Sequence, residues 1–180
     1  MKFILKDYQD DAVSGVLDRM KKARKWWHED KVISAFSLTA TTGAGKTVMA
    51  AAVFEALFFG SDDHKFEPDP GAVVIWFSDD PSLNEQSKYR LMEAADKLTV
   101  SDLVTVENTF GRETFEPGKI YFLNTQKLSK NSMLVRGHDA NDAGVETVGG
   151  TPLMPDARSH TIWDTIRNTV DDPGLTLYLV

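Results

Sequence analysis

The segment at residues 40–47 constrains the fold of this chain more than any other. It reads Ala-Thr-Thr-Gly-Ala-Gly-Lys-Thr, and it lies between a β-prone stretch at residues 34–39 and an alanine-rich apolar stretch at residues 46–59. The first stretch predicts a short strand, and the second predicts a helix that ends at Gly60. A loop of small residues between a strand and a helix is typical of a turn that binds phosphate in α/β proteins.

The residue types in this loop fit phosphate chemistry. Gly43 and Gly45 lack a Cβ atom, so the backbone can approach an anion closely and point its N–H groups at phosphate oxygens. The helix that begins at Lys46 adds the positive end of its dipole. The ammonium of Lys46 can reach the outer phosphates, and the hydroxyl of Thr47 can bind Mg²⁺. We therefore predict a site for ATP and Mg²⁺, with Lys46 and Thr47 as its catalytic residues.

The loop departs from the usual phosphate-binding pattern at one position, because Ala40 stands where the first glycine is expected. The alternative interpretation is an ordinary glycine-containing turn followed by an ordinary lysine. The context of a strand before the loop and a helix after it favours nucleotide binding. The residues expected around the phosphates are Thr42, Gly43, Ala44, Gly45, Lys46, Thr47 and Val48.

Strand-like and helical stretches alternate along the chain, which predicts an α/β fold with a parallel sheet and helices on both faces. Further helices are expected at residues 7–24, 81–98 and 161–170, and further strands at residues 72–77, 103–106, 120–123 and 175–180. Residues 136–160 show no periodicity and are expected to form a loop or insertion. We divide the chain into an N-terminal helical segment, residues 1–30, and a nucleotide-binding domain, residues 31–180.

Composition excludes several classes of protein. The 20 basic and 27 acidic residues give a net charge of −7, so contact with nucleic acid would require a local groove. The absence of cysteine excludes disulfides, thiolate metal sites and a cysteine nucleophile. Because no signal-like or membrane-spanning apolar run is present, a cytoplasmic protein is expected. The apolar strand at residues 175–180 suggests that the chain is a fragment of a longer protein.

Several segments together resemble the conserved motifs of superfamily 2 helicases and translocases. The phosphate loop resembles motif I, in which alanine is common at the first position. Residues 5–9, Leu-Lys-Asp-Tyr-Gln, resemble the short R-x-Y-Q element that precedes motif I. Residues 73–86 are similar to motif Ia, and residues 120–128 resemble the segment before motif II. Residues 162–180 resemble the approach to the DEAD/DEAH strand.

The combination is most similar to the helicase (Res) subunit of type III restriction enzymes. This resemblance implies the first RecA-like lobe of an ATP-driven DNA motor, in which Gln9 hydrogen-bonds adenine and Tyr8 lies nearby. It also implies that DNA and a modification methyltransferase subunit are partners. The DEAD/DEAH box would follow Val180, so the fragment is expected to bind nucleotide but to hydrolyse it poorly. The candidate DNA contacts are Ser78, Gln86, Lys88 and Arg90.

Two other functions remain open from the sequence. Asp79 and Asp80 follow an apolar stretch and could hold Mg²⁺, as in a small-molecule kinase of the P-loop class. We favour the alternative that both cap the helix that begins near Pro81, since aspartate fits a helix N-cap. A nucleotide-binding module without hydrolysis is the other alternative.

Overall fold

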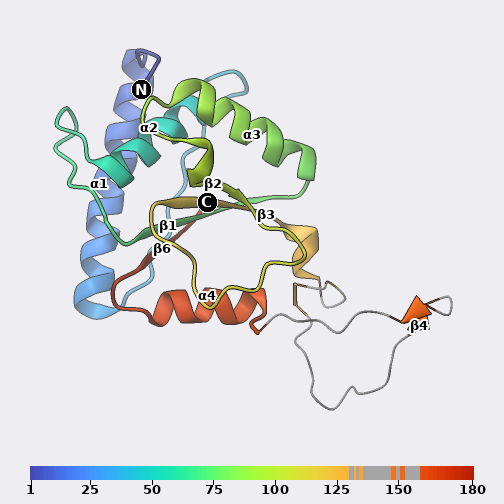
Figure 1. The fold of residues 1–180 in the computed structure, drawn as a ribbon. Coiled ribbons are helices and arrows are strands. Elements are labelled where there is room, and N and C mark those ends of the chain that lie inside the picture. The colour runs from blue at the N-terminus through green and yellow to red at the C-terminus, as the bar shows by residue number, and fades with distance from the viewer. Residues whose placement is uncertain (130–131, 133, 136–146, 149–150, 153–158) are drawn as a thin grey trace.

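The computed structural model describes residues 1–129, 132, 134–135, 147–148, 151–152 and 159–180. Within these residues the main sheet has four strands in the order β2-β3-β1-β6, and every neighbouring pair is parallel (Figure 1). The strands are β1 (Ala72–Ser78), β2 (Leu103–Thr105), β3 (Lys119–Asn124) and β6 (Thr176–Leu179). The helices are α1 (Asp7–Asp30), α2 (Lys46–Phe59), α3 (Pro81–Ala94) and α4 (Ile162–Asp171), with 3-10 turns η1 (Val100–Asp102) and η2 (Thr125–Leu128).

Helices cover both faces of the main sheet (Figure 1). One face of β1 and β3 packs against α1, α2 and α3, and the other face packs against α4. Consecutive residues of both central strands are therefore buried, as in other parallel sheets that are covered on both sides. The first core includes Ala72, Val74, Ile120 and Phe122, and the second includes Val73, Ile75, Tyr121 and Leu123. The predicted α/β fold with a parallel sheet and helices on both faces is confirmed.

Helix α2 is the most deeply buried helix of the described residues, because every residue from Ala51 to Leu57 is buried. Its small alanine side chains let it lie close to the sheet, where Phe54 meets the ring of Trp76 edge to face at 6.0 Å. Helices α1 and α3 both pack against α2. The first turn of α2, which carries the loop at residues 40–45, is thereby fixed against the core.

The predicted strand at residues 34–39 is wrong. These residues belong to no strand, and Phe36 and Leu38 are about two-fifths exposed. A strand requires a partner for its backbone N–H and C=O groups. In the part of the chain that the structure describes, β6 pairs with β1 alone and no strand pairs with residues 34–39. The β-prone side chains there are not sufficient to form a strand.

Two helix ends also differ from the prediction. Helix α1 continues to Asp30 rather than ending at Arg24, because residues 25–30 contain no glycine or proline, and it ends where Lys31 adopts a left-handed conformation. Helix α3 ends at Ala94 rather than at residue 98, because the next backbone N–H groups bond to a side chain of α2.

Most of the predicted loop or insertion at residues 136–160 lies outside the described residues. Within it the structure places a short antiparallel pair, β4 (Thr147–Val148) and β5 (Thr151–Pro152). Among the described residues, no helix has both the length and the apolar character needed to cross a membrane.

Glu55 is a buried carboxylate that joins α2 to the end of α3. It accepts hydrogen bonds from the backbone N–H groups of Asp96 and Lys97, and it pairs with the N-terminal ammonium of Met1 at 2.6 Å. Burial alone would raise the pKa of Glu55. The hydrogen bonds from the N-terminal ammonium and from the two backbone N–H groups outweigh burial, so its pKa lies below the ordinary value of 4.5.

We expect Glu55→Gln to lower the free energy of unfolding by about 1–3 kcal/mol at pH 7, because the buried ion pair is lost and the two N–H groups donate to a neutral amide oxygen instead of a carboxylate. A carboxylate with a lowered folded-state pKa stabilises the protein above its unfolded-state pKa and stops doing so as pH falls through the folded-state pKa. The difference between variant and wild type should therefore shrink below about pH 4.5. Urea denaturation over this pH range measures it. Glu29→Gln, at an exposed position of α1, is the control, and a pH-independent difference for Glu55→Gln would contradict the assignment.

Candidate nucleotide-binding site

The loop before α2 has two glycines in the left-handed region of backbone space. Gly43 has a φ of +83° and Gly45 a φ of +82°. The turn is closed by a hydrogen bond from the N–H of Ala44 to the carbonyl of Thr41 at 3.2 Å. A residue with a Cβ atom is strained in this conformation. At Gly45 there is also no room, because an added Cβ would lie 2.5 Å from the side-chain nitrogen of Gln9.

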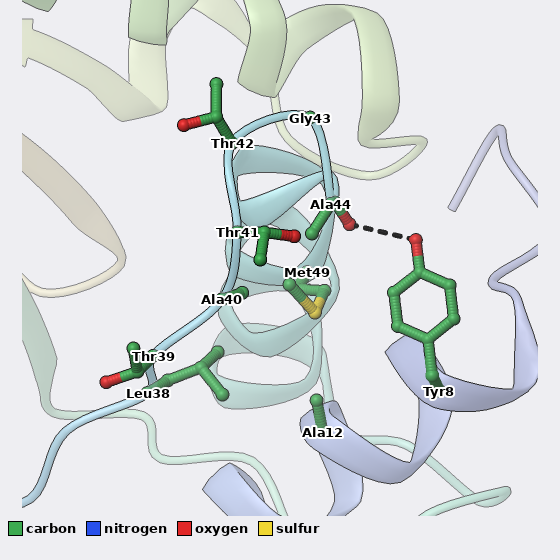
Figure 2. Close-up of a pocket in the computed structure, with 10 residues that line it drawn as sticks. All are labelled: Tyr8, Ala12, Leu38, Thr39, Ala40, Thr41, Thr42, Gly43, Ala44 and Met49. Atoms are coloured by element: carbon green, nitrogen blue, oxygen red, sulfur yellow. Dashed lines mark hydrogen bonds between the residues drawn. The ribbon is translucent and has the colours of Figure 1, made fainter.

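A cavity of about 510 Å³ lies between this loop and the start of α1 (Figure 2). Its volume is within the range of small-molecule sites. Figure 2 shows Tyr8 on the α1 side, facing Ala44 on the loop. The lining residues are Tyr8, Ala12, Leu38, Thr39, Ala40, Thr41, Thr42, Gly43, Ala44 and Met49.

The N-terminus of α2 carries no side-chain cap. Its N-cap residue is Gly45, which has no side chain, and no side chain of the described residues bonds to the N–H groups of the first turn. These N–H groups have no partner within the helix, and they form the positive end of the helix dipole. The loop and the helix start therefore present backbone donors that suit an anion such as phosphate.

Lys46 and Thr47 begin the first turn of this helix. The Lys46 ammonium is exposed and donates to the carbonyl oxygens of Ala40 at 2.8 Å and Thr41 at 3.1 Å. The positive charge is thus held at the start of the loop, beside the cavity that Ala40 and Thr41 line. Thr47 is partly exposed, and its hydroxyl oxygen is a hard donor of the kind that Mg²⁺ prefers.

Gln9 and Tyr8 reach the loop from α1. The Gln9 side chain accepts from the N–H of Lys6 at 3.0 Å and donates from Nε2 to the carbonyl of Ala44 at 2.9 Å. The Tyr8 hydroxyl donates to the same carbonyl at 3.2 Å. The structure therefore brings these two residues together with the loop, although 35 or more positions separate them in the sequence.

Several residues of the cavity were not singled out from the sequence. Ala12 lies one helical turn after Tyr8, so helical spacing could have indicated it. The sequence predicts Leu38 and Thr39 to lie in a strand, and it predicts Met49 to be an ordinary apolar residue of the helix at residues 46–59. No sequence signal distinguishes these three as cavity residues.

Asp79 and Asp80 follow β1 and already have partners. Asp80 is the N-cap of α3 and accepts from the N–H of Ser82 at 2.8 Å. Hydrogen bonds from the backbone and the hydroxyl of Ser82 lower the pKa of Asp80. Asp79 accepts from the Thr125 hydroxyl at 2.7 Å. These contacts favour the helix-cap interpretation of Asp80 over Mg²⁺ binding in a kinase-like site.

The candidate DNA contacts lie on β1 and α3. Ser78 donates to the side chain of Asn84 at 2.7 Å, and Lys88 donates to the Thr105 hydroxyl at 2.9 Å. Arg90 pairs with Glu93 at 2.8 Å, and Gln86 is exposed. The structure does not bring these residues to the phosphate loop cavity.

The carboxyl edge of the sheet joins some of these candidates. Ser78 ends β1, and Asn124, its partner in register, ends β3. Thr105, which holds Lys88, ends β2. Asn124 is buried, and its side-chain nitrogen has no hydrogen-bond partner. An unpaired buried donor is unusual among the residues that the structure describes.

The parallel sheet, the glycine loop and the helix that starts at its lysine define a P-loop domain of the RecA-like class. Residues 2–149 match the sequence model of a family described as the type III restriction enzyme, res subunit. The chain belongs to this family and is a helicase-like domain of the restriction-enzyme type. No curated protein and no solved structure matched the chain.

We expect Gly45→Ala to lower the free energy of unfolding by about 1–2 kcal/mol, the cost of a left-handed residue with a Cβ atom. The collision with Gln9 adds to this cost. Gly15→Ala is the matched control, because Gly15 is an exposed residue of α1 with open space around its added Cβ. There the substitution should stabilise the protein by up to about 1 kcal/mol. Thermal unfolding compares the two, and equal effects would contradict the strained geometry at Gly45.

Proposed function

We propose that this chain binds ATP and Mg²⁺ on the loop at residues 40–47, as the ATP-binding lobe of a DNA helicase or translocase related to type III restriction enzymes. The observation that carries the proposal is the uncapped start of α2 at a cavity-lining loop with two left-handed glycines. Membership in the family supports ATP as the ligand and a hydrolase as the parent protein.

In this proposal the backbone N–H groups of Gly43 and of residues 45–48 bind the phosphates, while the N–H of Ala44 closes the turn. The Lys46 ammonium, which bonds to two loop carbonyls, exchanges these neutral acceptors for charged phosphate oxygens, and charge-assisted hydrogen bonds are the stronger ones. Thr47 supplies one oxygen to Mg²⁺, and the bound metal neutralises phosphate charge. The Tyr8 ring lines the cavity and can pack against the base. Adenine recognition by Gln9 stays a prediction.

We propose that the chain by itself turns ATP over slowly. Asp79 and Asp80 have other partners in the structure, so they are poor candidates for activating water or holding the metal. A modification methyltransferase subunit is proposed as a partner of the parent on the basis of the family alone. Stimulation of ATP hydrolysis by DNA in the parent would separate a motor from a nucleotide-binding module without hydrolysis.

Lys46→Ala should weaken Mg²⁺-ATP binding by about tenfold or more, because one charge-assisted contact to phosphate is lost. Isothermal titration calorimetry measures the affinity. Lys22→Ala removes the same charge from an exposed position of α1 and should leave the affinity unchanged. Equal ATP affinity of Lys46→Ala and wild type would refute the proposed site.

We also propose that a DNA strand contacts the carboxyl edge of β1, β2 and β3. Ser78 offers a hydroxyl there, and Lys88 offers a positive charge. Phosphate contacts carry no sequence information, which suits a motor that moves along DNA of any sequence.

Lys88→Ala should weaken binding of a single-stranded oligonucleotide and reduce its salt dependence. Loss of one phosphate contact lowers the slope of log affinity against log salt by about 0.7 for single strands. Fluorescence anisotropy at several salt concentrations measures the slope, with Lys22→Ala as the control. An unchanged slope for Lys88→Ala would place the DNA contact elsewhere.

A further inference from the structure

Two side chains of α1 bond to one carbonyl in the phosphate loop. The Ala44 oxygen accepts from Gln9 Nε2 at 2.9 Å and from the Tyr8 hydroxyl at 3.2 Å. Both bonds point to the peptide that joins Ala44 to Gly45. We infer that Tyr8 and Gln9 are positioning residues that lock this peptide in the orientation that binds phosphate, an inference that rests on the proposed function.

Because the peptide bond is planar, holding the Ala44 oxygen also fixes the direction of the Gly45 N–H. In a trans peptide the C=O and the following N–H point in opposite directions. Figure 2 shows the Ala44 oxygen directed out of the loop, toward Tyr8. The N–H of Gly45 is therefore directed to the opposite side, toward the interior of the loop. By holding the oxygen, Tyr8 and Gln9 aim a donor at the place proposed for phosphate.

The Ala44–Gly45 peptide needs such a restraint because Ala44 lies between two glycines, Gly43 and Gly45. Gly43 and Gly45 have φ values of +83° and +82°, and glycine crosses between backbone conformations at little cost. A reversed peptide would turn the Ala44 oxygen inward, where it would repel a phosphate. Two hydrogen bonds to the oxygen oppose this reversal.

The orientation of the Gln9 amide is itself determined by its surroundings. Its oxygen accepts from the N–H of Lys6 at the start of α1, so its nitrogen must face the loop. The side chain is buried and occupies the space that a Cβ of residue 45 would need. Both polar atoms of Gln9 thus already have a partner when no base is present, and these two bonds keep the amide in this orientation.

Ligands with and without a base test whether Tyr8 and Gln9 act on phosphate binding by positioning the Ala44–Gly45 peptide. Gln9→Met, Tyr8→Phe and the double variant are titrated calorimetrically with Mg²⁺ complexes of ATP, GTP and inorganic tripolyphosphate. Each single substitution removes one hydrogen bond to the Ala44 oxygen and should weaken all three ligands by about threefold to tenfold, with a larger loss in the double variant. Tyr89→Phe, at an exposed tyrosine of α3, is the control and should change nothing.

A measurement without nucleotide gives a separate readout. The ¹³C chemical shift of the Ala44 carbonyl should move upfield in each variant, because a carbonyl that accepts fewer hydrogen bonds is less deshielded. Thermal unfolding verifies that the variants are folded, and Tyr8→Phe, at a half-exposed side chain, keeps the test decisive should Gln9→Met not fold.

The outcomes separate the inference from the proposed function. Equal losses for the three ligands, together with a shifted carbonyl resonance, support the lock. A loss confined to ATP makes Gln9 a base reader and overturns the lock, as does an unmoved carbonyl resonance. If the wild type binds none of the ligands, the proposed function fails, and the carbonyl resonance still decides whether the two side chains hold the peptide.

Discussion

The burial of α2 against the sheet holds the phosphate loop in place. The loop itself is largely exposed, whereas α2 is buried from Ala51 to Leu57 between α1, α3 and the sheet. A helix that is fixed along its length fixes the direction of its first N–H groups. The donors of the site are therefore positioned by apolar packing one or two turns away, and the loop can keep the glycines that an anion requires.

Elements with strong local signals could be predicted from the sequence. Helix α2 has the predicted bounds, Lys46 to Phe59, because alanine and leucine favour helix and Gly60 stops it. Strand β1 was predicted because a short apolar run of strand length is typical of a parallel sheet. Residues 34–39 carry a similar β-prone pattern but form no strand, since pairing depends on a neighbour that the local sequence does not encode.

In the candidate site, too, some features could be predicted from the local sequence and others depend on how distant elements pack. The glycines and the lysine at residues 43–46 could be proposed as a phosphate site because the proposal depends only on neighbours in the sequence, and their role stays a prediction. The bonds of Gln9 and Tyr8 to Ala44 could not, because they depend on how α1 packs against α2. The resemblance to helicases placed Gln9 near the nucleotide, but only the structure gives its hydrogen-bond partners. Asp80 illustrates the converse, since its cap of α3 follows from local spacing.

Tyr8 and Gln9 can hold the loop only if α1, which carries them, is itself more firmly packed than the loop. Helix α1 meets this condition at its other end, where Arg24 approaches the buried carboxylate of Asp69 at 3.8 Å. Asp69 also accepts from the Tyr178 hydroxyl of β6 at 2.9 Å, and burial, followed by the charge of Asp69, raises the pKa of Tyr178, which keeps this donor protonated. Between the two ends, Val13 and Leu17 are fully buried in the core shared with α2. The side chains that reach the loop are thus carried by a helix tied to the sheet, and the loop takes its shape from that support.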